Sequence, residues 1–194
     1  GLDEPSESFV YEMDTLCKKY EVCLVADEVQ AGFGRTGSFF GFQKYKIKPH
    51  IISMAKGMGN GFPVGGILIH PSIQAKYGML GTTFGGNHLA CAAVLSVLDT
   101  LQKEQLQQNA IEMGAYFVKR AQEVPGVQKI KGRGLMLGLE FEFEVGELRK
   151  KLIYDHHIFT GGSSNKKLLR ILPPLCIEKK HIDALIHALK TILK

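Results

Sequence analysis

The sequence predicts an α/β fold in its first half and a small α+β domain in its second half. Short, nearly continuous apolar runs such as 22–26 and 51–54 alternate with segments of helical periodicity, as expected for sheet strands covered on both faces. Glycine-rich stretches follow both runs, and open α/β sheets bind ligands at the carboxyl ends of their strands. After Lys103 the pattern changes to amphipathic helices between short strands. We therefore expect two domains, at 1–103 and 104–194.

The first domain is expected to begin with a helix over 8–20, where apolar residues recur at helical spacing. Its strands are expected at 22–26, 50–54 and 64–70, because these runs are short and apolar. A short helix or turn over 39–45 connects the first strand to the second. Together these segments form a sheet with helical connections.

Two helices and a loop complete the first domain. The proline that opens 71–76 suits the first turn of a helix, because that position has no amide hydrogen bond to lose. Residues 81–86 form a glycine-rich loop, and Asn87 is a good amino-terminal cap for a helix over 88–101. The alanine-rich stretch 90–93 favours close packing of that helix in the interior.

The second domain alternates helices with short strands. An amphipathic pattern predicts a longer helix over 105–122, and helices are also expected over 147–155 and 179–193. The expected strands are 127–131, 135–143, a short one near Ile158, and 168–172. This mixture is typical of a small α+β domain.

Composition excludes several classes of function. The 194 residues are 45% hydrophobic and 22% charged, and the formal net charge of +5 comes from scattered lysines and arginines. Without a basic block or interleaved aromatic residues, nucleic acid is not an expected ligand. No apolar run approaches the roughly 20 residues that cross a bilayer, and no secretory or transit signature appears. We expect a cytoplasmic protein that binds no membrane.

The cysteines and histidines do not indicate a metal site. The four cysteines lack paired metal spacing and lie in or beside apolar stretches, which predicts buried free thiols in a reducing compartment. The adjacent pair His156 and His157 points to opposite faces if it lies on a strand. We therefore expect no bound metal.

Asp27 and Lys56 are the residues that indicate chemistry. Each directly follows an apolar run, so the two are expected at equivalent strand ends facing one cleft. Pyridoxal phosphate needs a lysine amine to bind its aldehyde and an acidic partner for its ring nitrogen. A lysine released from the aldehyde can also carry a proton between carbon atoms. The pair therefore predicts a pyridoxal phosphate site.

A nucleotide-binding loop is the competing interpretation of the glycines near Lys56. The phosphate-binding loop of nucleotide-binding proteins places its lysine after the glycines and before a serine or threonine. Here the lysine precedes the glycines. Glycines in this position instead allow the backbone to approach a bulky cofactor.

Several blocks together resemble one enzyme family. VADEVQAGFGRTG, SMAKGMGNGFPVGG, GTTFGGNHLAC, KGRGLMLGLE and LLRILPPLCI occur in the order found in the class III aminotransferases of the fold-type I pyridoxal phosphate group. Within that family they are most similar to the acetylornithine aminotransferase branch, which includes members that use succinylornithine. The resemblance covers essentially the whole chain.

The resemblance implies a domain assignment. Residues 1–103 correspond to the second half of the pyridoxal phosphate-binding large domain, a mixed, mostly parallel sheet with helices on both faces. Residues 104–194 correspond to the carboxyl-terminal small domain. Because the start GLDEP lacks an initiator methionine, we expect the chain to be the carboxyl-terminal portion of a longer protein. The family's phosphate-binding loop, ring-stacking aromatic residue and substrate-gating acidic residue would then lie upstream.

The resemblance also assigns residues to the site. It implies that Lys56 is catalytic and binds the cofactor, that Asp27 meets the ring nitrogen, and that Val29 and Gln30 lie against the ring and near its phenolic oxygen. Core packing is nearly as good an explanation for Val29. Glu28, which points away from Asp27 on a strand end, is expected to be structural.

Two further residues come from later blocks. Thr83 is implied to reach the cofactor phosphate of a neighbouring subunit, which makes the expected protein a homodimer with a shared active site. Turn formation or helix capping is the alternative for Thr83. Arg170 is implied to bind a substrate carboxylate through parallel hydrogen bonds, with a surface ion pair as its alternative. The segment 161–164 is expected to border the substrate pocket, and Arg35 and Arg133 to support loops and domain contacts.

The implied function is transfer of the terminal amino group of N-acetylornithine or succinylornithine to 2-oxoglutarate, in arginine biosynthesis. Three alternatives remain open. Related class III transaminases that act on ornithine or 4-aminobutyrate share these blocks. Alternatively, the chain by itself is a catalytically silent fragment that lacks the upstream half of the active site. A family member that carries out racemisation or aminomutase chemistry is the third alternative, because the same lysine and aspartate serve those reactions.

Overall fold

The computed structural model describes residues 2–194, which form two compact units. The amino-terminal unit comprises Pro5–Gly34 and Ser38–Leu106, and the carboxyl-terminal unit comprises Gln107–Lys194 with the segments up to Glu4 and Arg35–Gly37. The main division between these units falls between Leu106 and Gln107, and the assignment of 1–103 and 104–194 to two domains stays a prediction. No pattern in the sequence predicted that two short early segments belong to the same unit as the second half of the chain.

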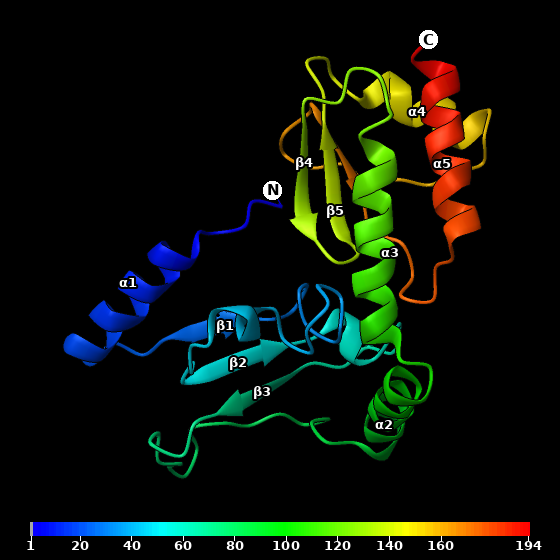
Figure 1. The fold of residues 1–194 in the computed structure, drawn as a ribbon. Helices are drawn as coiled ribbons and strands as arrows, with labels where there is room; N and C mark the ends of the chain where they lie inside the picture. Colours follow the sequence, from blue (N-terminus) through cyan, green and yellow to red (C-terminus); the bar gives the residue numbers. More distant parts are fainter. Residues whose placement is uncertain (1) are drawn as a thin grey trace. The chain divides into compact units, whose positions relative to one another are not determined.

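The amino-terminal unit contains a three-stranded sheet in the order β1 (Val25–Asp27), β2 (Ile51–Met54) and β3 (Gly66–Ile69), drawn in Figure 1. Strands β1 and β2 are parallel, with Asp27 opposite Ser53, whereas β3 runs antiparallel to β2. The sheet is therefore mixed, as expected, but in the described chain one of its two pairings is parallel.

The two α-helices of this unit begin at side-chain caps, of which Asn87 was expected and Ser6 was not. Helix α1 (Glu7–Lys19) starts where the Ser6 side chain accepts a hydrogen bond from the Phe9 amide at 3.2 Å. Helix α2 (His88–Lys103) starts at Asn87, whose Oδ1 accepts from the Ala90 amide at 2.9 Å. Such bonds satisfy amides that have no partner inside the helix. Two short 3-10 helices, η1 (Gly41–Tyr45) and η2 (Lys56–Met58), follow β1 and β2.

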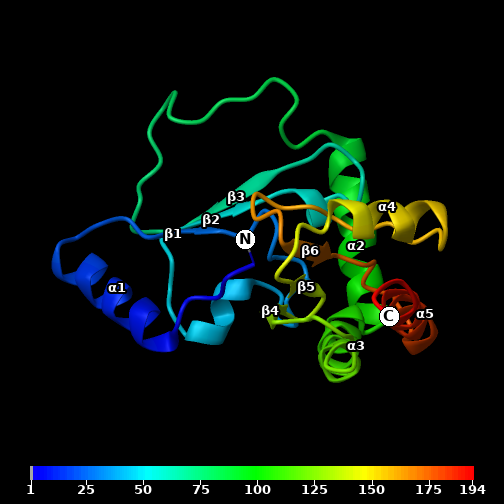
Figure 2. The ribbon, with the colours of Figure 1, turned by 90° about the horizontal axis from the view of Figure 1, so that it is seen from above.

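The expected helix over 71–76 is absent from the described structure. The segment instead forms a turn in which the Ile73 amide donates to the His70 carbonyl at 3.0 Å. His70 Nδ1 also lies 2.9 Å from Ser72 Oγ. Figure 2 shows the connection between β3 and α2 extending away from the sheet. A proline favours the first turn of a helix but does not supply the apolar face that stabilises one.

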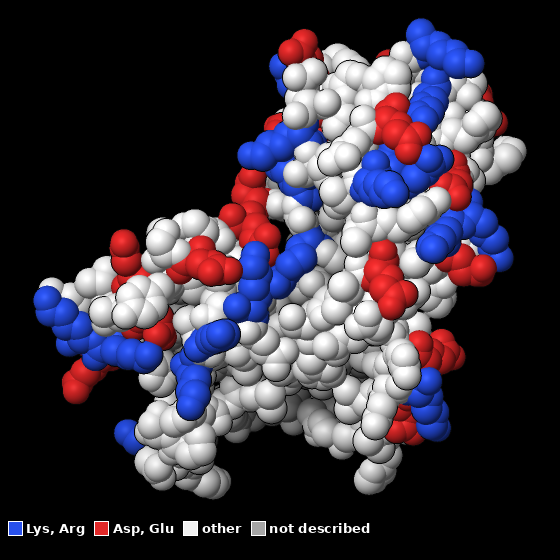
Figure 3. All heavy atoms as spheres, in the orientation of Figure 1, with Lys and Arg blue, Asp and Glu red and all other residues white. Residues whose placement is uncertain are grey.

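The sheet and α2 are less covered than the sequence predicted. Val25, Ile67 and Leu68 are all about half exposed, and Ala90 is the one buried residue of α2. The lower left part of the face in Figure 3, which corresponds to β3 and its connection to α2 in Figure 1, is largely uncharged. These strands and α2 are therefore partly exposed in the described chain, and the expectation of an interior α2 is wrong for these residues. None of the helices within residues 2–194 has the length and apolar character needed to cross a membrane.

The carboxyl-terminal unit contains an antiparallel sheet in the order β4 (Lys129–Arg133), β5 (Met136–Glu140) and β6 (Leu168–Ile171). Its helices are α3 (Leu106–Ala121), α4 (Gly146–Tyr154) and α5 (Lys179–Ile192), all close to the expected positions. The short strand expected near Ile158 is instead an isolated bridge between Gly161 and Arg170.

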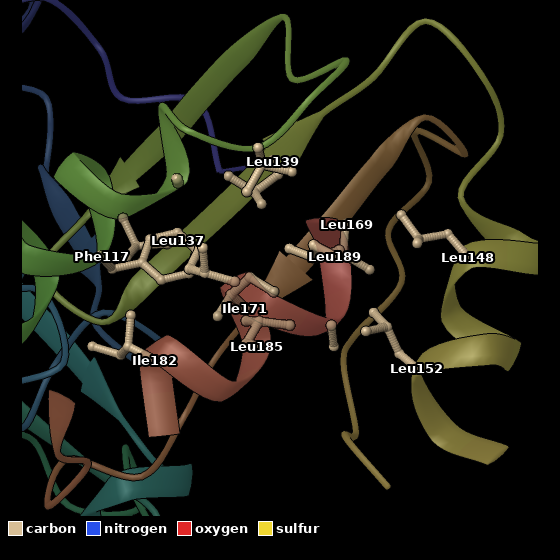
Figure 4. Close-up of a cluster of buried hydrophobic side chains, with 14 of the residues drawn as sticks. Phe117, Leu137, Leu139, Leu148, Leu152, Leu169, Ile171, Ile182, Leu185 and Leu189 are labelled. Atoms are coloured by element: carbon tan, nitrogen blue, oxygen red, sulfur yellow. The ribbon is translucent and has the colours of Figure 1, made fainter. Parts of the chain in front are cut away.

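One apolar core holds the carboxyl-terminal unit together. Figure 4 shows side chains from β5 and β6 packing against residues of α3, α4 and α5. Leu139, Leu152 and Leu189 are completely buried. Alternate residues of β5 and β6 enter this core because successive side chains of a strand point to opposite faces. Burial of this kind is the main stabilising contribution to folding.

The cysteines are free, as expected, but they are not buried. Cys17 is half-buried, and Cys23, Cys91 and Cys176 are exposed. The apolar stretches around them lie partly on uncovered surfaces, so neighbouring hydrophobic residues did not predict burial here. Across residues 2–194, no group of three His, Cys, Asp or Glu side chains is arranged to hold a metal ion.

Candidate active site

Asp27 is the last residue of β1 and is exposed at the carboxyl end of the strand. Its Oδ1 accepts two hydrogen bonds, one from the Ser53 hydroxyl of β2 and one from the Val29 amide, each at 3.1 Å. Both bonds end on the same oxygen, so within residues 2–194 the carboxylate retains Oδ2 for a further donor. The two bonds fix the orientation of the carboxylate.

The neighbouring carboxylate of Glu28 has a different role. Glu28 is buried, with 3% of its surface exposed, and its two oxygens accept from the amides of Gly41 and Phe42 at 2.8 Å each. The Glu28 side chain therefore caps η1 by accepting hydrogen bonds from its first two amides. The structural role expected for Glu28 is confirmed, and Asp27 is the carboxylate that remains at the strand edge.

Lys56 is separated from the end of β2 by one residue, and it has an exposed side chain and a left-handed backbone, at φ 47°. Residues other than glycine rarely adopt this region, and such strain is concentrated at functional sites. The Lys56 carbonyl accepts from the amides of Gly59 and Asn60 at 3.2 Å each. The turn therefore holds the lysine at the carboxyl end of β2.

The loops after β1 and β2 touch each other. A Cβ atom at Gly57 would lie 3.5 Å from Cβ of Phe33, which is an ordinary contact. At Gly59 a Cβ atom would lie 2.4 Å from the Phe62 carbonyl oxygen and 2.6 Å from a Val64 methyl group, so no side chain fits there. The glycines compact the loop that carries Lys56 against the loop that follows Asp27.

Val29 and Gln30 occupy the turn immediately after Asp27. Val29 is half-buried and Gln30 is exposed. The turn is closed by a 3.0 Å hydrogen bond from the Gly32 amide to the Glu28 carbonyl. Both residues therefore lie close in sequence to Asp27, and their contacts with a cofactor stay a prediction.

Thr83 is not brought to Asp27 or Lys56. It is exposed in the connection between β3 and α2, and no hydrogen bond between it and either residue occurs in the described part of the chain. Its expected contact with the cofactor phosphate of a neighbouring subunit stays a prediction.

Arg170 lies on β6 in the carboxyl-terminal unit. It is paired with Gly138 of β5 on one side, and on the other it exchanges two backbone hydrogen bonds with Gly161, at 2.8 and 3.0 Å. Its Nε is buried and has no hydrogen-bond partner within residues 2–194. Arg170 also lines a cavity of about 680 Å³ whose walls include Phe159, Thr160 and further mainly apolar side chains.

Arg35 and Arg133 have supporting roles within the carboxyl-terminal unit. Arg35 donates to the carbonyl oxygens of Leu135, at 3.3 Å, and Pro173, and burial lowers the pKa of its guanidinium group. Arg133 donates to the Thr36 hydroxyl at 3.4 Å and pairs with a carboxylate of the early segment. These bonds hold the segment Arg35–Gly37 in place, so the expected role in loop support is confirmed.

Ser53 was missed by reasoning from the sequence. Its hydroxyl donates to Asp27 across the parallel pairing of β1 and β2. The available signal was a single hydroxyl residue in the otherwise apolar run Ile51–Met54. Its meaning depends on register, because a shift of one residue would turn the side chain to the other face.

Comparison with known proteins gives a consistent family. The family described as aminotransferase class-III matches residues 1–193. An acetylornithine aminotransferase of Aquifex aeolicus is 43% identical over all of this chain. The chain spans about half the length of such curated relatives, 50% in this case.

Solved structures agree with the sequence comparison. An ornithine delta-aminotransferase of Plasmodium falciparum superimposes with a TM-score of 0.86 at 34% identity, covering 97% of this chain and 51% of that one. An ornithine aminotransferase of Toxoplasma gondii, crystallised with oxidized glutathione, superimposes with a TM-score of 0.83 at 26% identity, over 96% of this chain and 46% of that one. That protein has partial occupancy of PLP at its active site.

Proposed function

The chain belongs to the class III aminotransferases, and from this premise we propose that it forms part of a pyridoxal phosphate-dependent aminotransferase of arginine biosynthesis. The proposed amino donor is N-acetylornithine or succinylornithine, and the proposed acceptor is 2-oxoglutarate. One observation supports the cofactor most strongly. Asp27 is the last residue of β1 and Lys56 follows β2, and these two strands are paired in parallel.

The residues present fit this cofactor. Asp27 has an oriented carboxylate with one oxygen available for a protonated ring nitrogen, and Lys56 extends an exposed amine from a strained turn. When bound, pyridoxal phosphate supplies the aldehyde and an electron-accepting ring. Asp27 keeps the ring nitrogen protonated, and Ser53 keeps Asp27 oriented.

Lys56 performs two tasks in this proposal. Its Nζ would hold the cofactor aldehyde in the resting enzyme. When it is free of the aldehyde, the same Nζ would accept the proton that leaves the substrate carbon and deliver it to the cofactor carbon, which is general base and acid catalysis. The hydrogen-bonded turn around Lys56 limits the positions from which Nζ can act.

The remaining residues bind rather than react. Val29 packs against the ring, Gln30 lies near its phenolic oxygen, and Arg170 binds a substrate carboxylate. Arginine suits that task because its planar group forms two parallel hydrogen bonds with a carboxylate. Thr83 acts in a homodimer, where its hydroxyl reaches the phosphate of the cofactor in the neighbouring subunit. The expected location is the cytoplasm.

A second substrate is supported by the structural relatives. Because an ornithine delta-aminotransferase superimposes closely, ornithine is the first alternative donor, and 4-aminobutyrate is the next. Half-reactions with acetylornithine, succinylornithine, ornithine and 4-aminobutyrate would separate these choices. The donor that converts the cofactor fastest at equal concentration identifies the substrate.

The proposal is tested by locating the cofactor on the protein as the cell produces it. Wild-type protein, Lys56→Ala and the control Lys48→Ala would be incubated with pyridoxal phosphate, reduced with borohydride and digested. Mass spectrometry is expected to find a pyridoxyl group on Lys56 in wild-type protein and in the control. Absence of label at Lys56 would overturn the proposal, and absence from the present chain alone would support the silent-fragment alternative for that chain.

A further inference from the structure

Resting on the proposed role of Arg170, we propose that Gly161 is a positioning residue for substrate recognition. The missing side chain at 161 determines where the Arg170 guanidinium group lies. It thereby determines how well that group binds a carboxylate.

Arg170 has glycine on both neighbouring strands. Gly138 is its partner on β5, and Gly161 is its partner across the isolated bridge. Residues directly opposite each other in a sheet point to the same face. Across the sheet, the long cationic side chain of Arg170 therefore lies between two glycines, which have no side chain.

The two glycines are not equivalent. A Cβ atom at Gly161 would lie 2.9 Å from Nε of Arg170 and 3.3 Å from its Cβ. A Cβ atom at Gly138 would instead meet Leu2 at 2.8 Å and Leu168 at 3.0 Å. The arginine thus lies over Gly161, while apolar side chains occupy the space above Gly138.

The polar groups beside Gly161 favour an anionic ligand. Nε of Arg170 and Oγ1 of Thr160 are both buried without a hydrogen-bond partner among residues 2–194, and both residues line the same cavity. A buried donor without a partner is energetically unfavourable. A ligand carboxylate would provide acceptors for these donors.

A second arginine fixes the backbone of this segment. Arg149 of α4 donates from Nη2 to the Thr160 carbonyl at 3.1 Å. Its Nη1 would lie 2.9 Å from a Cβ atom at Gly162. Two arginines from different elements therefore pack against consecutive glycines, and Arg149 holds the strand segment on which Arg170 rests.

This geometry separates binding from stability. An alanine methyl group at 161 would overlap Nε of Arg170, which is part of a flexible side chain and can move away. The free energy of unfolding should therefore change little, whereas the Arg170 guanidinium group is displaced from its position. A residue whose role is merely structural would instead change stability.

The test uses Gly161→Ala and Gly161→Val in the protein as the cell produces it. Gly146→Ala is the matched control, because no atom lies within 4 Å of a Cβ built there. The first readout is the rate at which phenylglyoxal modifies Arg170, followed by peptide mass spectrometry. Both Gly161 variants are expected to react severalfold faster than the control, with unchanged thermal unfolding. Equal rates would overturn the inference whether or not the enzyme is active.

The second readout is the KM for 2-oxoglutarate. Loss of one charge-assisted hydrogen bond corresponds to about a tenfold rise in KM for Gly161→Ala. In the Arg170→Ala background the Gly161 substitution is expected to add nothing, since it acts through that arginine. Additive effects would overturn the inference. If Arg170→Ala itself leaves KM unchanged, the proposed role of Arg170 in substrate binding fails instead.

Discussion

Replacing Glu28 by alanine should destabilise the amino-terminal unit strongly. The carboxylate is 3% exposed and accepts two backbone hydrogen bonds of 2.8 Å from Gly41 and Phe42. Hydrogen bonds to charged groups contribute about 1.5–3 kcal/mol each, and their loss leaves buried donors without partners. The two bonds together correspond to about 3–6 kcal/mol. Glu28→Gln keeps one acceptor oxygen and should cost roughly half as much.

Hydrogen exchange measures this effect locally. The amides of Gly41 and Phe42 are expected to lose protection in Glu28→Ala, and urea unfolding should shift to lower concentration with an unchanged slope. Glu12→Ala is the control, because Glu12 is exposed in the same unit. If the two substitutions cost the same, or if both amides stay protected in Glu28→Ala, the assigned capping role is wrong.

Further predictions concern the core, the strained lysine and pH. Leu139→Ala, at a completely buried position, should lower the free energy of unfolding in urea by about 3 kcal/mol. Phe159→Ala, at a position that is 84% exposed, should lower it far less. Equal losses would contradict the assignment of Leu139 to the core. The free energy of unfolding of Lys56→Gly should exceed that of Lys56→Ala by about 1 kcal/mol, because glycine adopts a positive φ without strain. Equal values in calorimetry would show that the backbone at Lys56 is not strained. The hydrogen bond from Lys131 lowers the pKa of the Glu140 carboxyl group. The ionised carboxylate therefore stabilises the fold at neutral pH. This contribution is lost as the pH falls below the usual pKa of a glutamate, about 4, and through the lowered pKa of the folded state. Lys131→Met should therefore lower Tm at neutral pH and flatten its decline on acidification; parallel Tm curves would exclude this linkage.

Regular elements were predictable because their signals are local. The helical spacing of α3 and α5 and the alternation of Leu137 and Leu139 on β5 follow from burying one face of each element. The expected cap Asn87 precedes α2. The failed helix at 71–76 had a suitable first residue but no apolar face to bury.

The detail of the candidate site was less predictable, because it depends on register and long-range contacts. The sequence identified Asp27 and Lys56 by their positions after apolar runs. It did not indicate the left-handed backbone of Lys56, since lysine has no preference for positive φ. Nor did it indicate that Gly161 lies opposite Arg170, which is a consequence of how the bridge beside β6 is formed.

Strand β3 has a consequence for handling the isolated chain. It is an outermost strand of its sheet in the described chain, and it exposes Ile67 and Leu68, whose side chains point to opposite faces. An open, hydrophobic edge with unpaired amides and carbonyls is a template onto which other molecules can add strands. Refolding at high protein concentration should therefore yield insoluble assemblies. Leu68→Lys should increase the yield of soluble protein.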